Sequence, residues 1–307
     1  MVSKNFILPV TSPFRLDLTV WALRRRKINI IDQWDGKCYS RIFVFNNSPV
    51  KITLTQEDTT TEQTIKVTLQ SGKDITPQIQ EEVKLLIQKM FGITLDLQPF
   101  YALAKNNNTL KSLVEQFLGV KPPRFASIFE GLINSIACQQ VTLSLGILML
   151  NRLSENFGVK FLENNTISYA FPQPIDLAEV SEEKIKKLGF SYQKSRAIKE
   201  IATNVMNNTI NLENLETMTN KEILDYLSAI RGIGRWSAEY VLLRGLGILD
   251  TFPGDDVGAQ NNLKRIFELD NKPSYEEIKK ITSQWQPYAG LVYFHLLLEK
   301  LQGKGVI

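Results

Sequence analysis

The spacing of hydrophobic residues changes along the chain, and this change constrains the fold more than any other feature of the sequence. Apolar and polar residues alternate over 42–44, 50–54 and 65–69, and turn-forming residues separate these segments. This pattern is typical of antiparallel strands joined by hairpins. The segment 77–92 then has helical spacing, with a proline at its first helical position and a glycine at its end. We therefore expect a helix packed on an antiparallel sheet.

Helical spacing replaces the alternation from about Tyr101 onward and continues to the last residues. The sequence thus predicts an α+β fold. We expect a small N-terminal antiparallel sheet domain with its helix over residues 1–105, followed by a larger all-helical region over residues 106–307.

Composition excludes several kinds of site. The net charge of +4 permits a polyanionic partner without requiring one. The two cysteines, Cys38 and Cys138, are far apart, which argues against a disulfide framework or a cysteine metal cluster. The single histidine, His295, stands among apolar residues in LVYFHLLLEK, as a core histidine does. An acid or base in a site of this protein would therefore be a carboxylate.

The first residues, MVSKNFILPV, lack the features of a signal peptide, and no apolar run approaches the length of a membrane span. We expect an intracellular protein in a reducing compartment, with no membrane partner.

The segment RGIGRWSAEYVLLRGLG, residues 231–247, places two glycines between two predicted helices. Gly232 and Gly234 tolerate positive φ and allow another backbone to approach closely. Free N–H groups at the start of the next helix attract a phosphate, and Arg231 and Arg235 add positive charge. The pattern predicts a clamp for a nucleic-acid backbone. On the glycines alone, a plain helix–helix turn is an equally good interpretation.

Two aromatic residues and two carboxylates follow this turn. Trp236 and Tyr240 are four residues apart, so their rings share one face of the helix. Asp255 and Asp256, in FPGDDVG, precede another predicted helix, where aspartate is a preferred N-cap. One carboxylate can cap the helix while the other faces a cleft. The aromatic pair fits either a core or a pocket.

The order of these motifs resembles the helix-hairpin-helix superfamily of base-excision DNA glycosylases, and within it the AlkA-type 3-methyladenine DNA glycosylase II. Residues 129–146, FEGLINSIACQQVTLSLG, are similar to the family's helix and minor-groove loop, and residues 170–202 to its central helices. The resemblance runs from about Phe14 to the final helix. It implies a helical glycosylase region of two subdomains that acts on damaged double-stranded DNA without a cofactor. We expect a monomer.

By this resemblance Asp256 is the catalytic aspartate. Its carboxylate would stabilise the positive charge that develops on the sugar, and would orient or deprotonate the attacking water. Asp255 would cap the helix or support the loop. Trp236 occupies the place of the Schiff-base lysine of strand-nicking members. The resemblance therefore implies a monofunctional enzyme that hydrolyses the glycosidic bond with no lyase step.

The resemblance also assigns a wedge and a base pocket. Gln140, with Gln139 beside it, corresponds to the residue that fills the gap left by a flipped nucleotide. Trp236, Tyr240 and, more loosely, Trp21 correspond to aromatic residues of the base pocket, which favours alkylated purines because these often carry positive charge. The last helix reads Leu297 and Leu298 after His295, so we expect a thin aromatic cage.

The hairpin itself is implied to bind DNA through residues Arg231, Gly232, Ile233, Gly234 and Arg235. No side chains are expected to hold a metal, although the family's hairpin can bind a monovalent cation through backbone carbonyls. These carbonyls would correspond to Ser228, Ile230 and Ile233.

Two other interpretations stay open. The same hairpin with a different pocket would remove oxidised or deaminated bases. A non-catalytic module would use the hairpin only to bind DNA, but such a module needs neither Asp256 nor a wedge.

Overall fold

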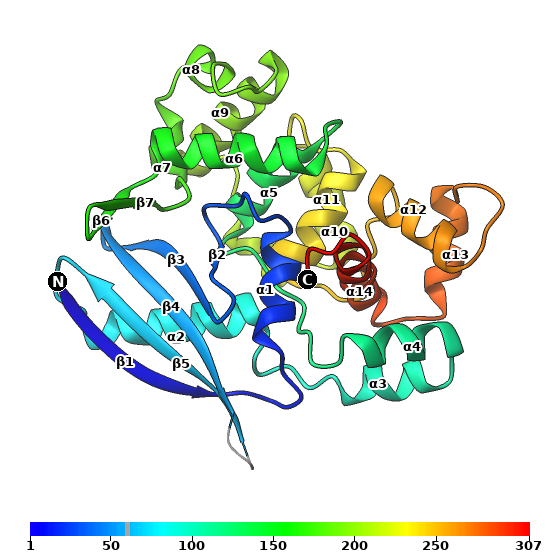
Figure 1. Cartoon of the computed structure of the whole chain (residues 1–307). Coiled ribbons are helices and arrows are strands. Elements are labelled where there is room, and N and C mark those ends of the chain that lie inside the picture. The colour runs from blue at the N-terminus through cyan, green and yellow to red at the C-terminus, as the bar shows by residue number, and fades with distance from the viewer. Residues whose placement is uncertain (59–61) are drawn as a thin grey trace.

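The computed structural model describes residues 1–58 and 62–307 and confirms the predicted α+β fold (Figure 1). The N-terminal part contains a five-stranded antiparallel sheet in the order β1-β5-β4-β3-β2. Its strands are β1 (Val2–Pro9), β2 (Gln33–Trp34), β3 (Cys38–Phe45), β4 (Ser48–Asp58) and β5 (Gln63–Ser71). Asn46 and Asn47 both have positive φ between β3 and β4, as a two-residue hairpin turn requires.

Helix α2 (Pro77–Phe91) packs on one face of this sheet, as the sequence predicts. The Thr76 side chain caps its first turn by accepting the Ile79 N–H at 3.3 Å, and Gly92 ends it with φ of 56°. The apolar side chains of α2 and of the alternating strand positions form one buried core.

Helix α1 (Leu16–Arg24), which the sequence analysis did not identify, joins this core to the helical region. Leu16, Val20 and Leu23 pack on the core of the sheet. Leu18 and Trp21 face the other way, into a core shared with the C-terminal helices. Because α1 is buried on both sides, it lacks the polar face that marks an amphipathic helix in sequence.

The helical region is built as two groups of helices. Its members are α3 (Gln98–Lys105), α4 (Asn108–Gln116), α5 (Ile128–Cys138), α6 (Leu143–Phe157), α7 (Pro174–Ala178), α8 (Glu182–Lys186), α9 (Tyr192–Met206), α10 (Asn220–Ser228), α11 (Arg235–Val241), α12 (Val257–Ile266), α13 (Tyr275–Ser283) and α14 (Ala289–Gln302). A 3-10 helix lies at Glu213–Thr217, and a π-helical turn, Leu242–Leu246, continues α11.

One core gathers α1, α3, α4 and the helices from α12 to α14, while a second gathers α5 to α11. In Figure 1, α6 to α9 of the second group lie at the top and α3 and α4 of the first group at the lower right, with α1 and α14 between them. The predicted boundary between residues 105 and 106 falls in the turn between α3 and α4. A division of the chain at that point stays a prediction.

A short hairpin interrupts the region that was expected to be helical throughout. Strands β6 (Lys160–Glu163) and β7 (Thr166–Tyr169) pair across Asn164 and Asn165, both with positive φ. Phe161 packs on Ile42 of β3, and Glu163 accepts a hydrogen bond from Lys51 of β4 at 2.6 Å. These contacts with the sheet stabilise the hairpin. Its strands are too short to show a clear alternating pattern in the sequence.

Among the helices of residues 1–58 and 62–307, none is long and apolar enough to cross a membrane.

Candidate active site

The two-glycine turn adopts a tight hairpin between α10 and α11. Gly232 has φ of 85°, and a Cβ on it would lie 2.8 Å from the Ala197 Cβ. Gly234 has φ of −96° and is the N-cap of α11, with nothing within 4 Å of the place of its absent Cβ. Gly232 is thus required by backbone conformation and packing, whereas Gly234 leaves open space at the start of α11.

Helix α11 holds the loop that precedes the aspartate pair. Glu239, 4% exposed, accepts the Gly254 N–H at 3.1 Å and the Tyr275 hydroxyl at 2.6 Å. Burial raises the pKa of the Glu239 carboxyl, even though the hydrogen bonds from Tyr275 and Gly254 lower it. A Cβ on Gly254 would lie 2.7 Å from the Tyr275 ring, so the loop packs tightly there. The sequence analysis missed Glu239, whose only signal is a charged residue on the buried face of α11.

Asp256 both caps α12 and faces the aromatic residues. Its Oδ1 accepts the Ala259 N–H at 2.8 Å, as an N-cap does. Its Oδ2 lies 3.3 Å from Trp236 Nε1 and 3.2 Å from the Tyr293 hydroxyl, which both donate to it. The two carboxylate oxygens therefore have separate partners.

Of the two roles expected for Asp255, capping the helix or supporting the loop, the structure shows the second. Its carboxylate accepts two hydrogen bonds from Arg235, at 2.7 and 3.1 Å, and so ties the loop to the hairpin. The Arg235 guanidinium also lies 3.7 Å from the centroid of the Tyr275 ring. The cap falls to Asp256 because that residue directly precedes the first helical turn.

A cavity of about 1080 Å³ opens beside Asp256. Its wall brings together these sequence-predicted residues: Gln139, Gln140, Gly234, Trp236, Tyr240, Asp255 and Asp256. The carboxylate of Asp256 is therefore open to the cavity that Trp236 lines.

Other predicted residues lie outside the cavity wall. Trp21 is 8% exposed and packs in the core with α3 and α14, where the Arg24 guanidinium lies 5.0 Å from its ring. Ile233 is buried in the core of the second helical group. Arg231 is exposed and pairs with Glu200 at 3.4 Å.

The aromatic wall contains one residue more than the sequence indicates. The Trp236 and Tyr240 rings are stacked, with centroids 5.3 Å apart. Tyr293 of α14 joins them at the cavity, two residues before His295. The expectation of a thin aromatic cage was based on Leu297 and Leu298, which are not aromatic. Tyr293 shares a helix face with Leu297, four residues later, and this spacing was the available signal.

His295 is a core residue, as predicted. It is 1% exposed, its Nδ1 lies 2.8 Å from the Leu291 carbonyl oxygen, and its ring faces Phe100 and Phe117. Burial lowers its pKa to about 4.

The loop after α5 separates its two glutamines. Gln139 donates to the Gly232 carbonyl at 2.7 Å and to the Ser237 hydroxyl at 2.9 Å, and its own carbonyl accepts a hydrogen bond from Lys194 at 2.7 Å. The side-chain contacts fasten the loop to the hairpin and α11, and the bond from Lys194 to the backbone carbonyl fastens it to α9. Gln140 is exposed at the cavity, with φ of 52°.

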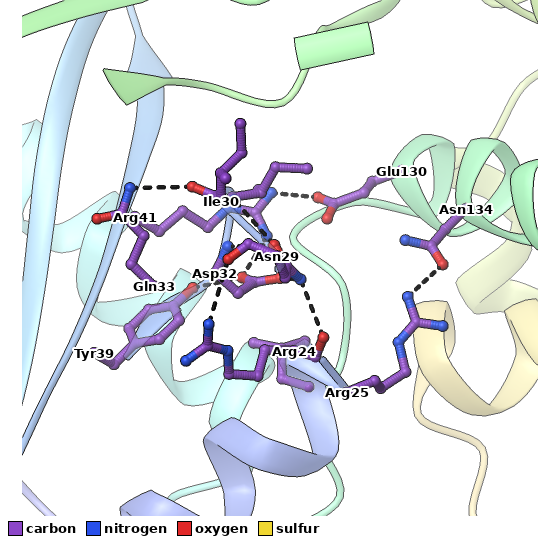
Figure 2. Close-up of polar contacts among 12 residues, drawn as sticks. Arg24, Arg25, Asn29, Ile30, Asp32, Gln33, Tyr39, Arg41, Glu130 and Asn134 are labelled. Atoms are coloured by element: carbon purple, nitrogen blue, oxygen red, sulfur yellow. Dashed lines mark hydrogen bonds and ion pairs between the residues drawn. The ribbon is translucent and has the colours of Figure 1, made fainter. Parts of the chain in front are cut away.

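The N-terminal part contributes Arg25 to the cavity, which the sequence analysis missed. Arg25 ends α1 with φ of 60°, and its guanidinium donates to the Tyr240 hydroxyl at 2.7 Å and to Asn134 Oδ1 at 2.8 Å. Figure 2 shows the contact with Asn134, together with the polar cluster beside it.

A second set of buried contacts holds the loop after α1, which carries Arg25 and Asp32, against α5 (Figure 2). Arg41 of β3 donates to Glu130 at 2.6 Å and to Asp32 at 3.0 Å, and Tyr39 also donates to Asp32. Glu130 lies one helical turn before Asn134. Arg25 and Arg41 therefore both bind one face of α5, and these contacts fix the position of the loop that carries Arg25.

A monovalent cation at the hairpin stays a prediction. The Ile230 carbonyl already accepts the Ile233 N–H at 3.0 Å, and its second lone pair leaves it able to coordinate. No group of three or more His, Cys, Asp and Glu side chains in the described ranges could hold a metal ion.

The fold and the site define a class of protein: a helix-hairpin-helix protein in which a carboxylate faces an aromatic cavity. The chain belongs to the HhH-GPD superfamily of base excision DNA repair proteins, whose family model matches residues 133–287. A DNA-3-methyladenine glycosylase of Bacillus subtilis (strain 168) is 26% identical over 296 residues, covering 95% of this chain and 96% of the relative.

Two further proteins are similar. The alkylbase DNA glycosidase-like protein mag2 of Schizosaccharomyces pombe (strain 972 / ATCC 24843) is 31% identical over 58% of this chain and 80% of its own. The solved 3-methyladenine DNA-glycosylase of Archaeoglobus fulgidus has a TM-score of 0.83 at 24% identity, covering 95% of this chain and 97% of that one. This structural likeness confirms the fold.

Proposed function

We propose that the protein is a monofunctional DNA glycosylase that flips alkylated purines out of duplex DNA and hydrolyses their glycosidic bond. The observation that carries the proposal is the position of Asp256, whose Oδ2 faces a cavity lined by the stacked Trp236 and Tyr240 rings. Membership of a base excision repair family and the names of the similar glycosylases support it.

Asp256 would act on the sugar. As the bond between C1′ and the base breaks, positive charge develops on the deoxyribose. A carboxylate held in place by three donors stabilises that charge without having to reorient. The same carboxylate can orient the water that attacks C1′ and accept its proton.

The aromatic wall would receive the base. Purines methylated on a ring nitrogen, such as 7-methylguanine, carry positive charge, which favours a place against an aromatic face. The charge also weakens the glycosidic bond, because the base then departs as a neutral molecule.

The hairpin and the loop of Gln139 and Gln140 would hold the DNA. Backbone N–H groups at the start of α11 attract a phosphate, and the open space at Gly234 lets the DNA backbone approach. Flipping a nucleotide costs a few kcal/mol in lost stacking and pairing. Gln140, exposed beside the cavity, would occupy the vacated space and hydrogen-bond the unpaired base.

Trp236 stands where strand-nicking relatives carry their lysine, so we propose that water is the nucleophile. The cavity does contain a lysine from another element, Lys300 of α14. Burial lowers its pKa, as does the like charge of Lys304, while Asp256 opposes this change. We propose that Lys300 contacts a DNA phosphate near the site rather than the sugar.

The test is incubation with duplexes that carry 7-methylguanine, 8-oxoguanine or hypoxanthine, followed by chromatography of the released bases. The proposal predicts release of 7-methylguanine, with strand breaks only after alkali or heat. Release of 8-oxoguanine or hypoxanthine without 7-methylguanine would favour the alternative of an enzyme for oxidised or deaminated bases. Binding with no release would indicate a module that only holds DNA, and breaks without alkali would contradict the hydrolytic mechanism.

A further inference from the structure

The short loop between α5 and α6, residues 139–142, contains a backbone conformation that needs support. Gln140, which is exposed, has φ of 52°. A residue with a β-carbon rarely adopts this left-handed region, so contacts around it must stabilise it. Gln139, just before it, is extended, with φ of −62° and ψ of 133°. The chain therefore changes direction at the peptide that joins residues 139 and 140.

Lys194 of α9 binds this peptide directly. Its ammonium group donates to the Gln139 carbonyl oxygen at 2.7 Å and to the Ala137 carbonyl oxygen at 3.1 Å. The Gln139 carbonyl belongs to the peptide between residues 139 and 140. The contact therefore fixes the orientation of that peptide, and with it the direction in which Gln140 leaves the end of α5.

The end of α5 is a favourable place for a cation. The last carbonyls of a helix have no partner within the helix, and the helix dipole gives this end a partial negative charge. Lys194 is half-buried, and burial lowers its pKa. In the described part of the chain it forms no ion pair with a carboxylate. Its charge is thus directed at the backbone of the loop.

The other contacts of the loop hold its two ends. The Gln139 side chain binds the hairpin, and the Thr142 side chain caps α6. Gly146 lets α6 pack closely on α5, because a Cβ there would lie 2.8 Å from the Cys138 Sγ. Within residues 1–58 and 62–307, Lys194 is the one hydrogen-bond donor to the Gln139 carbonyl.

A loop that is ordered in advance lowers the cost of opening a duplex. Flipping a nucleotide loses stacking and pairing, and a side chain that fills the vacated space offsets part of this loss. A loop that is already fixed gives up little conformational freedom when it enters the duplex. More of the binding free energy is then available to offset the lost stacking.

Building on the proposed function, we propose that Lys194 is a positioning residue for nucleotide flipping. It holds the peptide between residues 139 and 140 so that Gln140 enters the duplex in a conformation that is already formed. Lys194 touches neither the base nor the sugar. It acts through Gln140 on the flipping step and leaves the chemistry at Asp256 unchanged.

The test is a double-variant cycle that measures the single-turnover release of 7-methylguanine from duplex DNA. We expect Lys194→Met and Gln140→Ala each to slow release at least fivefold, and the double variant to be no slower than Gln140→Ala alone. Lys194→Arg, which keeps the charge and the donors, should retain most of the rate. The control is Lys199→Met, also in α9, since Lys199 has no hydrogen bond to the loop in the described ranges. It should release base at the wild-type rate.

A second measurement follows flipping without the chemistry. The duplex carries a 2′-fluorinated 7-methylguanine nucleotide, which resists hydrolysis, with 2-aminopurine beside it, which fluoresces when it is unstacked. At saturating protein, we expect Lys194→Met to give a smaller increase in fluorescence than the wild-type protein. A purely structural role, in which the variant only unfolds at lower urea concentration, would leave this increase unchanged.

Two results would overturn the inference. One is a wild-type rate and fluorescence increase in Lys194→Met. The other is a double variant slower than Gln140→Ala by the full factor of Lys194→Met, because Lys194 would then act independently of Gln140. If Lys194→Met does not fold, Lys194→Gln, which keeps a donor and loses the charge, replaces it in the same cycle. Failure of the wild-type protein to release any base would instead overturn the proposed function.

Discussion

The hydroxyl of Tyr293 lies 3.2 Å from Oδ2 of Asp256, although 37 positions separate the two residues. Burial, and next the Asp256 charge, raise the pKa of Tyr293 well above its ordinary value, so the hydroxyl stays protonated and donates. Together with Trp236, it gives Oδ2 of Asp256 two hydrogen-bond donors. The last helix of the fold thus orients a carboxylate that the hairpin and its loop bring to the cavity.

Replacing Tyr293 by phenylalanine removes one donor and keeps the ring. A hydrogen bond to a charged group contributes about 1.5–3 kcal/mol, so we expect the single-turnover rate of base release to fall by roughly tenfold or more. Tyr288→Phe is the control, because Tyr288 packs on Phe100 and does not line the cavity. A wild-type rate in Tyr293→Phe would show that Asp256 does not depend on this hydroxyl.

Glu239 is expected to act on the site by holding the loop before Asp256. In Glu239→Gln the amide has one acceptor oxygen for two donors, the Gly254 N–H and the Tyr275 hydroxyl. We expect the free energy of unfolding to fall by about 2 kcal/mol and base release to slow. Urea denaturation of this variant, of Tyr275→Phe and of the double variant measures the coupling. Additive losses would contradict a shared contact.

The two hairpin glycines should respond differently to alanine. Gly232→Ala places a Cβ at positive φ and 2.8 Å from the Ala197 Cβ, so we expect a loss of about 1–3 kcal/mol in stability. Gly234→Ala meets open space at φ of −96°, so the protein should fold normally but bind duplex DNA more weakly. Thermal unfolding and fluorescence anisotropy separate these effects. Equal melting temperatures for both variants, or wild-type DNA affinity for Gly234→Ala, would be the contrary results.

Much of the fold follows from patterns local in sequence. Alternation over β3, β4 and β5 and the capped α2 were predicted because each carries its own periodicity and turn residues. Helix α1 escaped prediction because it is buried between two cores, and its pattern therefore lacks a polar face. The β6–β7 hairpin depends on contacts with a distant sheet.

The residues of the site also fall into those predicted from local sequence patterns and those that only tertiary packing brings together. Trp236, Tyr240 and the aspartate pair lie within one stretch of chain, so motif spacing placed them together, and the structure shows them on one cavity. Arg25 and Tyr293 come from opposite ends of the sequence, and only the packing of α1 and α14 brings them there. Trp21 was assigned by a loose match, whereas the structure buries its ring in the core. The catalytic, base-pocket and DNA-binding roles themselves stay predictions.

His295 makes stability depend on pH. Its pKa is about 4 in the folded protein against 6.5 when unperturbed, so the unfolded chain binds a proton more readily. The contribution of the neutral, buried imidazole to the free energy of unfolding is fully present above pH 6.5 and is lost as the pH falls toward 4. The difference is about 3 kcal/mol. His295→Leu should remove this dependence. Urea denaturation at several pH values between 7.5 and 4 checks it, and parallel curves for the two proteins would contradict it.

The central claim is tested most directly with Asp256→Asn, which keeps the size of the side chain and an oxygen that can cap α12. The measurement is the single-turnover release of 7-methylguanine alongside the affinity for the same duplex. We predict that release falls by at least a hundredfold, since the negative charge beside the sugar is lost, while affinity stays within a few-fold of wild type. Base release at the wild-type rate by a folded Asp256→Asn protein would contradict the proposed mechanism.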